Sequence, residues 1–183
     1  MRVRIRFDRH GIVRRRFQRG VYALEWALIF PVLFVLLYAI ICYGLTYLVR
    51  ESMQFAVEEG ARAALRYPST AVLGGATPTW LHRSTEARQA AAHALTWLPA
   101  PIKPEADDIQ FTVCPVQDAS CTPATALNPA LTCDVHTPCL VLVSYTIENY
   151  AANAIAPAIP GLGLMLPSAL EAKASLLVDR RML

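Results

Sequence analysis

The longest uninterrupted run of apolar positions lies close to the N-terminus of the chain. Trp26 to Val49 form 24 consecutive positions without a formally charged side chain. About 20 such residues are enough for a helix to cross the hydrocarbon core of a bilayer. A buried helix of a soluble domain is rarely apolar on every face over this length. The pattern therefore predicts one transmembrane helix over residues 21–49.

A second helical pattern follows directly in residues 50–66. Apolar side chains recur there at intervals of three and four residues, which places them on one face of a helix. We therefore expect one helix from Val21 to Arg66, ended by Tyr67-Pro68, with an exported amphipathic second half. Pro31 lacks a backbone donor and should kink or loosen its first third. The apolar positions of the second half are Met53, Ala56, Val57, Gly60, Ala61, Ala64 and Leu65.

The pattern of apolar and polar positions in residues 67–183 predicts a small head with one further helix and a short antiparallel sheet. A stripe of small residues over Ser84 to Leu98 indicates a helix suited to close packing on the first one. Alternation of apolar and polar positions predicts half-buried strands over 109–114, 140–148 and 170–179. A helix is the alternative at Glu171-Ala172-Lys173. The fold class is therefore α+β, with a long N-terminal helix that extends into an extracytoplasmic head.

Two segments of the head predict irregular structure. Gly74-Gly75 and Pro78 mark a loop before the second helix. The segment from Tyr150 to Leu166 is rich in alanine, proline and glycine and contains no charged residue. This second segment is either a loop that lies over the head or an apolar contact surface, and the sequence leaves both open.

The distribution of charge assigns a side of the membrane to each end of the chain. Residues 1–20 contain eight arginines and one aspartate, whereas residues 50–183 contain nine basic and twelve acidic side chains. Basic residues beside a span hold that flank in the cytoplasm, so the head should be exported. A nucleic-acid-binding tail is the other reading of the arginines. Only Phe7 and Phe17 are interleaved with them, so we expect no nucleic-acid partner, although contact with anionic lipid can coexist.

The cysteines agree with an exported head. Cys42 lies inside the predicted span, where we expect it to be a small apolar packing residue. An even number of exported cysteines predicts two disulfides, and four cysteines allow three connectivities. These bonds would restrict the insert at 114–139, which has too few apolar residues for a core of its own. The disulfide candidates are Cys114, Cys121, Cys133 and Cys139.

Metal-binding and catalytic patterns are weak. Cys133, His136 and Cys139 are spaced three residues apart and offer zinc ligands, but the chain has no CxxC pair. It has four histidines and lacks GxSxG, Walker-type glycine-loop and HExxH motifs. We therefore expect neither a metal or other cofactor nor an enzyme activity.

Glu25 separates three readings of the N-terminus. A conventional secretory signal has a shorter apolar core and a small-residue cleavage site, which this segment lacks. An uncleaved anchor explains the apolar run but not a carboxylate inside it, which is costly in lipid. Cleavage after Gly20 would create an α-amino group on Val21 and make Glu25 the fifth residue of the mature chain. The carboxylate could then pair with the amine of its own or a neighbouring subunit, and such a pair matters more for register than for stability.

These residues resemble the TadE-like family of the tight-adherence (Flp) pilus assembly system, whose members are type IV pilin-like subunits. The resemblance rests on Gly20 followed by Glu25, on Pro31 and on Glu59-Gly60-Ala61-Arg62-Ala63-Ala64. Its specific part covers residues 14–66. The long leader, Trp26 in place of phenylalanine or tyrosine, and the four-cysteine insert depart from the family pattern.

The resemblance implies a membrane protein that is processed and assembled. A prepilin peptidase would cut between Gly20 and Val21 and remove the basic leader, 1–20. The mature chain would cross the inner membrane once, with a cytoplasmic N-terminus and a periplasmic head, and could enter a pilus. Its partners would be other pilin-like subunits and the inner-membrane assembly platform. The 163 residues that remain favour a minor pilin or pseudopilin, and the alternative is an uncleaved scaffold component.

Overall fold

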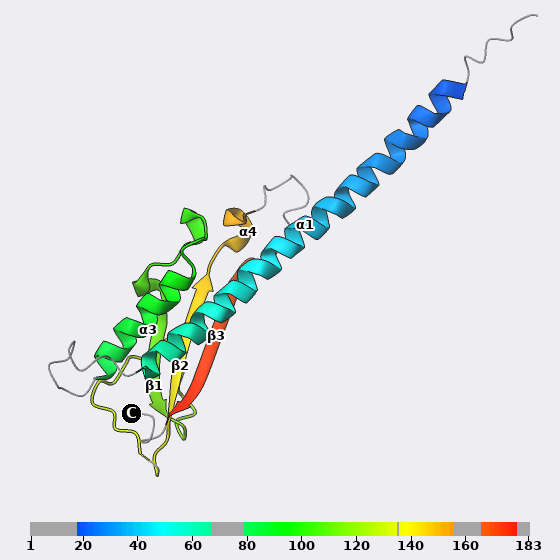
Figure 1. Cartoon of the computed structure of the whole chain (residues 1–183). Helices are drawn as coiled ribbons and strands as arrows, with labels where there is room; N and C mark the ends of the chain where they lie inside the picture. The colour runs from blue at the N-terminus through cyan, green and yellow to red at the C-terminus, as the bar shows by residue number, and fades with distance from the viewer. Residues whose placement is uncertain (1–17, 67–78, 135, 156–165, 179–183) are drawn as a thin grey trace, which may run out of the picture. The chain divides into compact units, whose positions relative to one another are not determined.

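The computed structural model describes residues 18–66, 79–134, 136–155 and 166–178 (Figure 1). The chain divides into two compact units, residues 1–41 and 42–183. Most of the leader, the Tyr67-Pro68 helix stop, the Gly74-Gly75 loop with Pro78 and most of the uncharged 150–166 segment lie outside the described residues. The helices are α1 (Gln18–Leu65), α3 (Trp80–Ala94) and α4 (Tyr150–Asn153), with 3₁₀ turns η1 (Ala100–Ile102) and η2 (Ala106–Asp108); the strands are β1 (Gln110–Pro115), β2 (Cys139–Ile147) and β3 (Leu170–Val178).

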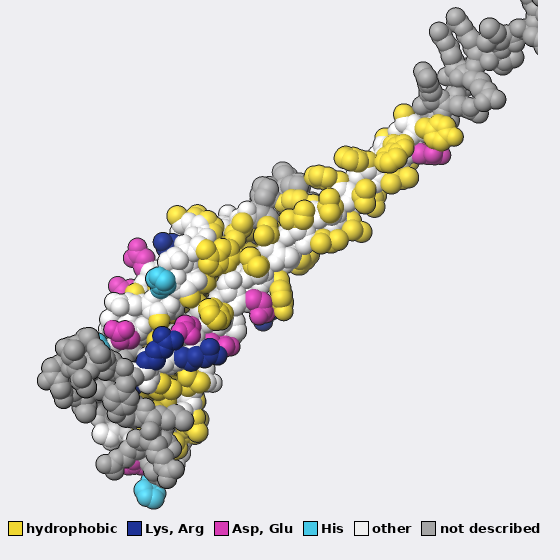
Figure 2. All heavy atoms as spheres, viewed as in Figure 1, with side chains coloured by type: hydrophobic (Ala, Val, Ile, Leu, Met, Phe, Trp, Pro, Cys, Tyr) yellow, Lys and Arg dark blue, Asp and Glu magenta, His cyan; other side chains and the backbone are white. Residues whose placement is uncertain are grey.

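Helix α1 is 48 residues long and continues through Pro31. A change of helix direction at this proline stays a prediction. In the first unit, the large apolar side chains of α1 from Tyr22 to Leu37 are exposed, and Figure 2 shows them covering its visible face. By length and composition, the part of α1 from Tyr22 onward is able to cross a membrane, which indicates a membrane anchor.

The second unit is built on a three-stranded antiparallel sheet in the order β1-β2-β3. Phe111 of β1 is paired with Val143 of β2, and Tyr145 of β2 with Ala172 of β3. These side chains are buried on one face of the sheet, as the alternation in the sequence predicts. The helix and the sheet confirm the α+β fold class, and each strand boundary lies within one residue of its predicted position.

One face of the sheet is covered by the second half of α1 and by α3 (Figure 1). The predicted apolar face of α1 is buried at Met53, Val57 and Ala61, each with no exposed area. Cys42 and Val49 are also buried, so the end of the predicted span belongs to the second unit. The core therefore reaches further toward the N-terminus than the amphipathic segment 50–66 alone.

Helix α3 begins and ends four residues earlier than the sequence predicts. Thr79 is its N-cap, because the Thr79 side chain accepts a hydrogen bond from the His82 amide. After Ala94, the amides of Leu95 and Leu98 bond three residues back, to Ala92 and Leu95. These tight turns end the α-helix before Pro99, although both leucines remain buried in the core.

A buried arginine joins the end of α1 to α3. Arg83 is 3% exposed, and its Nη1 donates a hydrogen bond of 2.7 Å to the carbonyl oxygen of Ala64. The last carbonyl groups of a helix have no intrahelical donor, so this bond satisfies one of them. The Arg83 guanidinium also lies 5.7 Å from the ring centroid of Trp80.

Candidate functional site

The predicted cleavage site lies in the first turn of α1. The helix begins at Gln18, so Gly20 and Val21 are its third and fourth residues. Amide groups in a first helical turn have no intrahelical acceptor, and glycine has low helix propensity. The bond after Gly20 therefore lies within the first turn of α1 that the structure describes, and cleavage there stays a prediction.

Glu25 is an exposed carboxylate on an otherwise apolar surface. Its neighbours Tyr22, Leu24 and Trp26 are each about two-thirds exposed, at 65%, 64% and 66%. In the described part of the chain, Glu25 forms no hydrogen bond or ion pair. Val21 precedes it by four residues, the spacing of neighbours on one helix face. A new amine on Val21 would therefore be within reach of Glu25 in the same chain or, after packing, in an adjacent one.

A row of aromatic rings follows along α1. Phe30 stacks on Phe34 with ring centroids 6.3 Å apart, and Phe34 stacks on Tyr38 at 6.5 Å. The three residues are four positions apart and therefore share one helix face. This row was not among the predicted site residues, although the spacing of four positions is a signal that the sequence contains. It gives the apolar segment a distinct side for packing against another helix.

The four cysteines of the insert form two local disulfides. Cys114 at the end of β1 is bonded to Cys121, and Cys133 is bonded to Cys139, the first residue of β2. Two disulfides were expected, and the structure selects one of the three connectivities. In the zinc alternative Cys133 and Cys139 would both be thiolates, whereas in the structure their sulfur atoms form a disulfide with each other.

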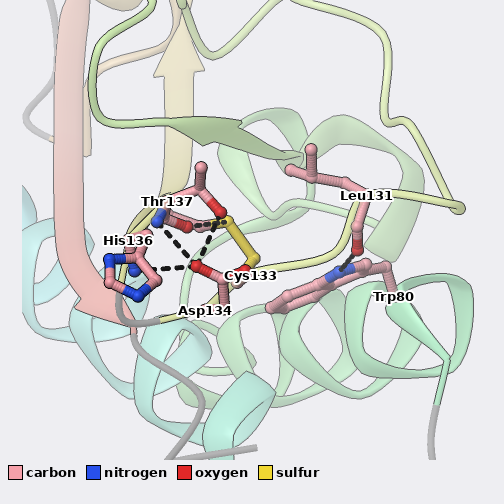
Figure 3. Close-up of a disulfide and its surroundings, with 7 residues drawn as sticks. Trp80, Leu131, Cys133, Asp134, His136 and Thr137 are labelled. Carbon is pink, nitrogen blue, oxygen red and sulfur yellow. Dashed lines mark hydrogen bonds between the residues drawn. A yellow bond between two sulfur atoms is a disulfide. The ribbon is translucent and has the colours of Figure 1, made fainter.

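Hydrogen bonds of Asp134 order the loop closed by Cys133–Cys139, and the nearby Leu131 is bonded to α3 (Figure 3). Asp134 Oδ1 accepts hydrogen bonds from the amides of His136 and Thr137, at 2.7 and 2.8 Å. The Thr137 and His136 amides hold the pKa of the exposed Asp134 carboxyl below its usual value. Nearby, Trp80 Nε1 of α3 donates to the carbonyl oxygen of Leu131 at 2.8 Å. The insert is therefore tied to α3, a contact that the sequence analysis did not identify.

The comparison with known families finds a match that covers nearly the whole of α1. Residues 20–62 match the model of the TadE-like protein family. The match begins at Gly20 and includes Glu25, Pro31 and Glu59 to Arg62, so it confirms the resemblance at the residues that carry it. It relates the chain to the Tad pilus system. No curated protein and no solved structure matches the chain.

Proposed function

We propose that this chain is a minor pilin or pseudopilin of a Tad (Flp, type IV) pilus assembly system. A prepilin peptidase cuts it after Gly20, and the mature protein acts in pilus initiation, biogenesis or adhesion at the tip. The observation that carries the proposal is the family match over 20–62, which starts at the glycine and includes Glu25. The exposed apolar surface of α1 supports it, because such a surface requires lipid or partner helices around it.

The proposed mechanism is physical and involves neither catalysis nor a cofactor. Before assembly, the apolar side chains of α1 face lipid in the inner membrane, with the N-terminus in the cytoplasm and the head in the periplasm. During assembly, the helix leaves lipid and packs among other pilin-like subunits on the inner-membrane platform. The exposed Glu25 carboxylate then pairs with the Val21 amine of a neighbour. A misaligned subunit would leave this charge buried and unpaired, which is costly, so the pair selects register.

The alternative is a membrane-anchored scaffold component that is never cleaved. One observation favours it: α1 begins at Gln18 and runs through the junction as a helix. A permanent anchor would use the same apolar surface and the same head. The two functions differ in the fate of residues 1–20 and in the need for Glu25.

Substitution of Glu25 tests the pairing role. Glu25→Gln and Glu25→Ala should insert into the membrane like the wild type but enter the pilus or its initiating complex at least about tenfold less, because the loss of one partner of a desolvated pair costs several kcal/mol. Glu51→Gln is the matched control, since Glu51 is an exposed carboxylate of the same helix beyond the apolar run. Membrane fractions and crosslinked subunits would be quantified in the native host. Assembly of Glu25→Ala at the wild-type level would rule out the pairing role.

A further inference from the structure

A groove opens in the second unit where the apolar run of α1 ends. It has a volume of about 500 Å³. One wall is α1, with Tyr43, Tyr47 and Arg50, and the other is the segment that enters β3, with Pro167 and Leu170. The groove therefore combines two aromatic side chains and one cation on α1 with an opposite wall that is apolar apart from Glu171.

The α1 wall presents its polar groups along a single line. Tyr43, Tyr47 and Arg50 are four and three residues apart, which places them on one helix face. Tyr43 is 50% and Tyr47 64% exposed, and Arg50 is exposed as well. Arg50 is the first charged residue after the 24 uncharged positions. Its guanidinium forms no ion pair or hydrogen bond in the described part of the chain.

The opposite wall is held in place by Tyr150. This residue is 1% exposed, its hydroxyl donates to Thr46 Oγ1 of α1 at 3.4 Å, and its amide donates to the carbonyl oxygen of Ser168 at 2.8 Å. Asn149 precedes it with a φ of 54°, a left-handed conformation that asparagine tolerates and that turns the chain from β2 into α4. These contacts fix the position of the opposite wall relative to α1.

Among the described charged residues that line the groove, Arg50 lacks a counterion. Glu171 also lines the groove, but its carboxylate lies 2.8 Å from the Lys173 ammonium. The acid in the opposite wall therefore already has a cation of its own. An anionic group entering the groove would meet Arg50 beside two tyrosine rings.

We propose that this groove binds the phosphodiester headgroup of a membrane phospholipid on the periplasmic side. The inference rests on the membrane-anchored state in the proposed function. A helix of 24 residues rises about 36 Å, slightly more than the 30 Å hydrocarbon core, so Arg50 stands at headgroup level. Tyrosine is enriched at that level, and the planar guanidinium of arginine matches phosphate in bidentate geometry. Bound lipid would hold the head against the membrane surface until the helix is extracted.

Lipid retention by the full chain in detergent micelles tests this inference. Native mass spectrometry would measure the fraction carrying one phosphatidylglycerol as the lipid is titrated. Arg50→Gln should raise the lipid concentration for half occupancy about fivefold, the effect of one arginine near a membrane surface. Arg50→Lys should retain most of the binding. Arg62→Gln is the matched control, because Arg62 is an exposed arginine of the same helix outside the groove, and it should bind like the wild type.

Each outcome decides the inference. Equal retention by Arg50→Gln and the wild type would overturn it, and so would an equal loss in Arg62→Gln, which would indicate general attraction between charges. Competition by free glycerol phosphate as strong as that by lipid would identify a soluble anion as the ligand instead. If Arg50→Gln reduced self-association but not lipid retention, the groove would be a subunit contact. The assay needs neither the peptidase nor a filament, so its result is independent of whether residues 1–20 are removed.

Discussion

A methyl group placed on Gly60 of α1 would lie 2.8 Å from the carbonyl oxygen of Ala87 in α3. It would also lie 3.0 Å from the Cβ of Ala91. Both distances are shorter than a packed carbon atom tolerates, so the two helices approach this closely only because residue 60 has no side chain. The stripe of small residues on α3 packs against Gly60, which lies within the segment that matches the TadE-like family.

Gly60→Ala should destabilise the second unit by about 1–3 kcal/mol, because one helix must move away from the other. Gly44→Ala is the matched control, since a methyl group there meets nothing within 4 Å. Both changes raise helix propensity by about 1 kcal/mol, so their difference isolates the contact. Urea unfolding of the full chain in detergent, followed by tryptophan fluorescence, measures it. Equal unfolding midpoints for the two variants would show that the helices do not pack as described.

Arg83→Met should cost about 1.5–3 kcal/mol of unfolding free energy, because the Ala64 carbonyl loses a charged donor while it stays buried. Hydrogen exchange should localise the effect to the amides in the last turn of α1. Arg62→Met is the control, since Arg62 is exposed and its ion pairs with Glu58 and Glu59 are long, at 3.6 and 3.8 Å. A loss of similar size in both variants would mean that Arg83 contributes no more than a surface charge.

Periodicity in the sequence predicts the parts of this fold that depend on one element at a time. The apolar face at Met53, Val57 and Ala61 and the alternation at Val141 and Val143 are direct consequences of helix and strand geometry. For that reason the helix–sheet architecture and the buried faces could be predicted closely. The candidate site at Gly20 and Glu25 also depends on spacing in one segment, and its role stays a prediction.

Contacts between distant segments were not readable in the same way. Four cysteines can pair in three ways, and their spacing alone does not favour one of them. The Cys114–Cys121 and Cys133–Cys139 bonds were therefore identified only from the structure. Burial of Arg83 depends on the end of another helix, and charged residues are rarely buried. The start of α3 could have been recognised, because Thr79 is a good N-cap residue, but the interpretation relied on the alanine stripe that begins later.

The two disulfides should differ in their contribution to stability. Their loops are similar, with separations of 7 and 6 residues, so chain entropy predicts similar stabilisation, about 2–3 kcal/mol each. Cys133 and Cys139 are both buried in the main core, at 7% and 1% exposure, whereas Cys121 is partly exposed. Replacing the Cys133–Cys139 pair by serines should therefore lower the unfolding midpoint more than replacing Cys114–Cys121, because it leaves hydroxyl groups in an apolar site. A larger loss for the Cys114–Cys121 pair would contradict this assignment.

Tyr145 should make stability depend on alkaline pH. Its hydroxyl donates to the Ile102 carbonyl oxygen at 3.0 Å, and burial, followed by the charge of Asp108, raises the pKa of Tyr145 to about 12. The unfolded phenol ionises near pH 10. Its contribution is therefore complete below pH 10, and about 2 kcal/mol of stability is lost as pH rises from 10 to 12.

Tyr145→Phe checks this sign. The variant should be about 1 kcal/mol less stable than the wild type at pH 8, because it lacks the hydrogen bond. The difference between the two proteins should shrink above pH 10 and reverse its sign before pH 12, because only the wild type loses the phenol contribution of about 2 kcal/mol. The midpoints of urea unfolding at four pH values measure this difference. The contributions of the other tyrosines are the same in both proteins and cancel. A constant difference across this range would show that the Tyr145 hydroxyl is not protected from ionisation.

The intact mass of the protein recovered from the membranes of a peptidase-positive host tests the central claim most directly. We expect a chain of 163 residues that begins at Val21, with two disulfides and Cys42 as the free thiol. In a host without the peptidase, or with Gly20 replaced by a bulky residue, the chain should keep residues 1–20. A full-length chain beginning at Met1 in the peptidase-positive host would contradict the pilin account and favour the permanent scaffold.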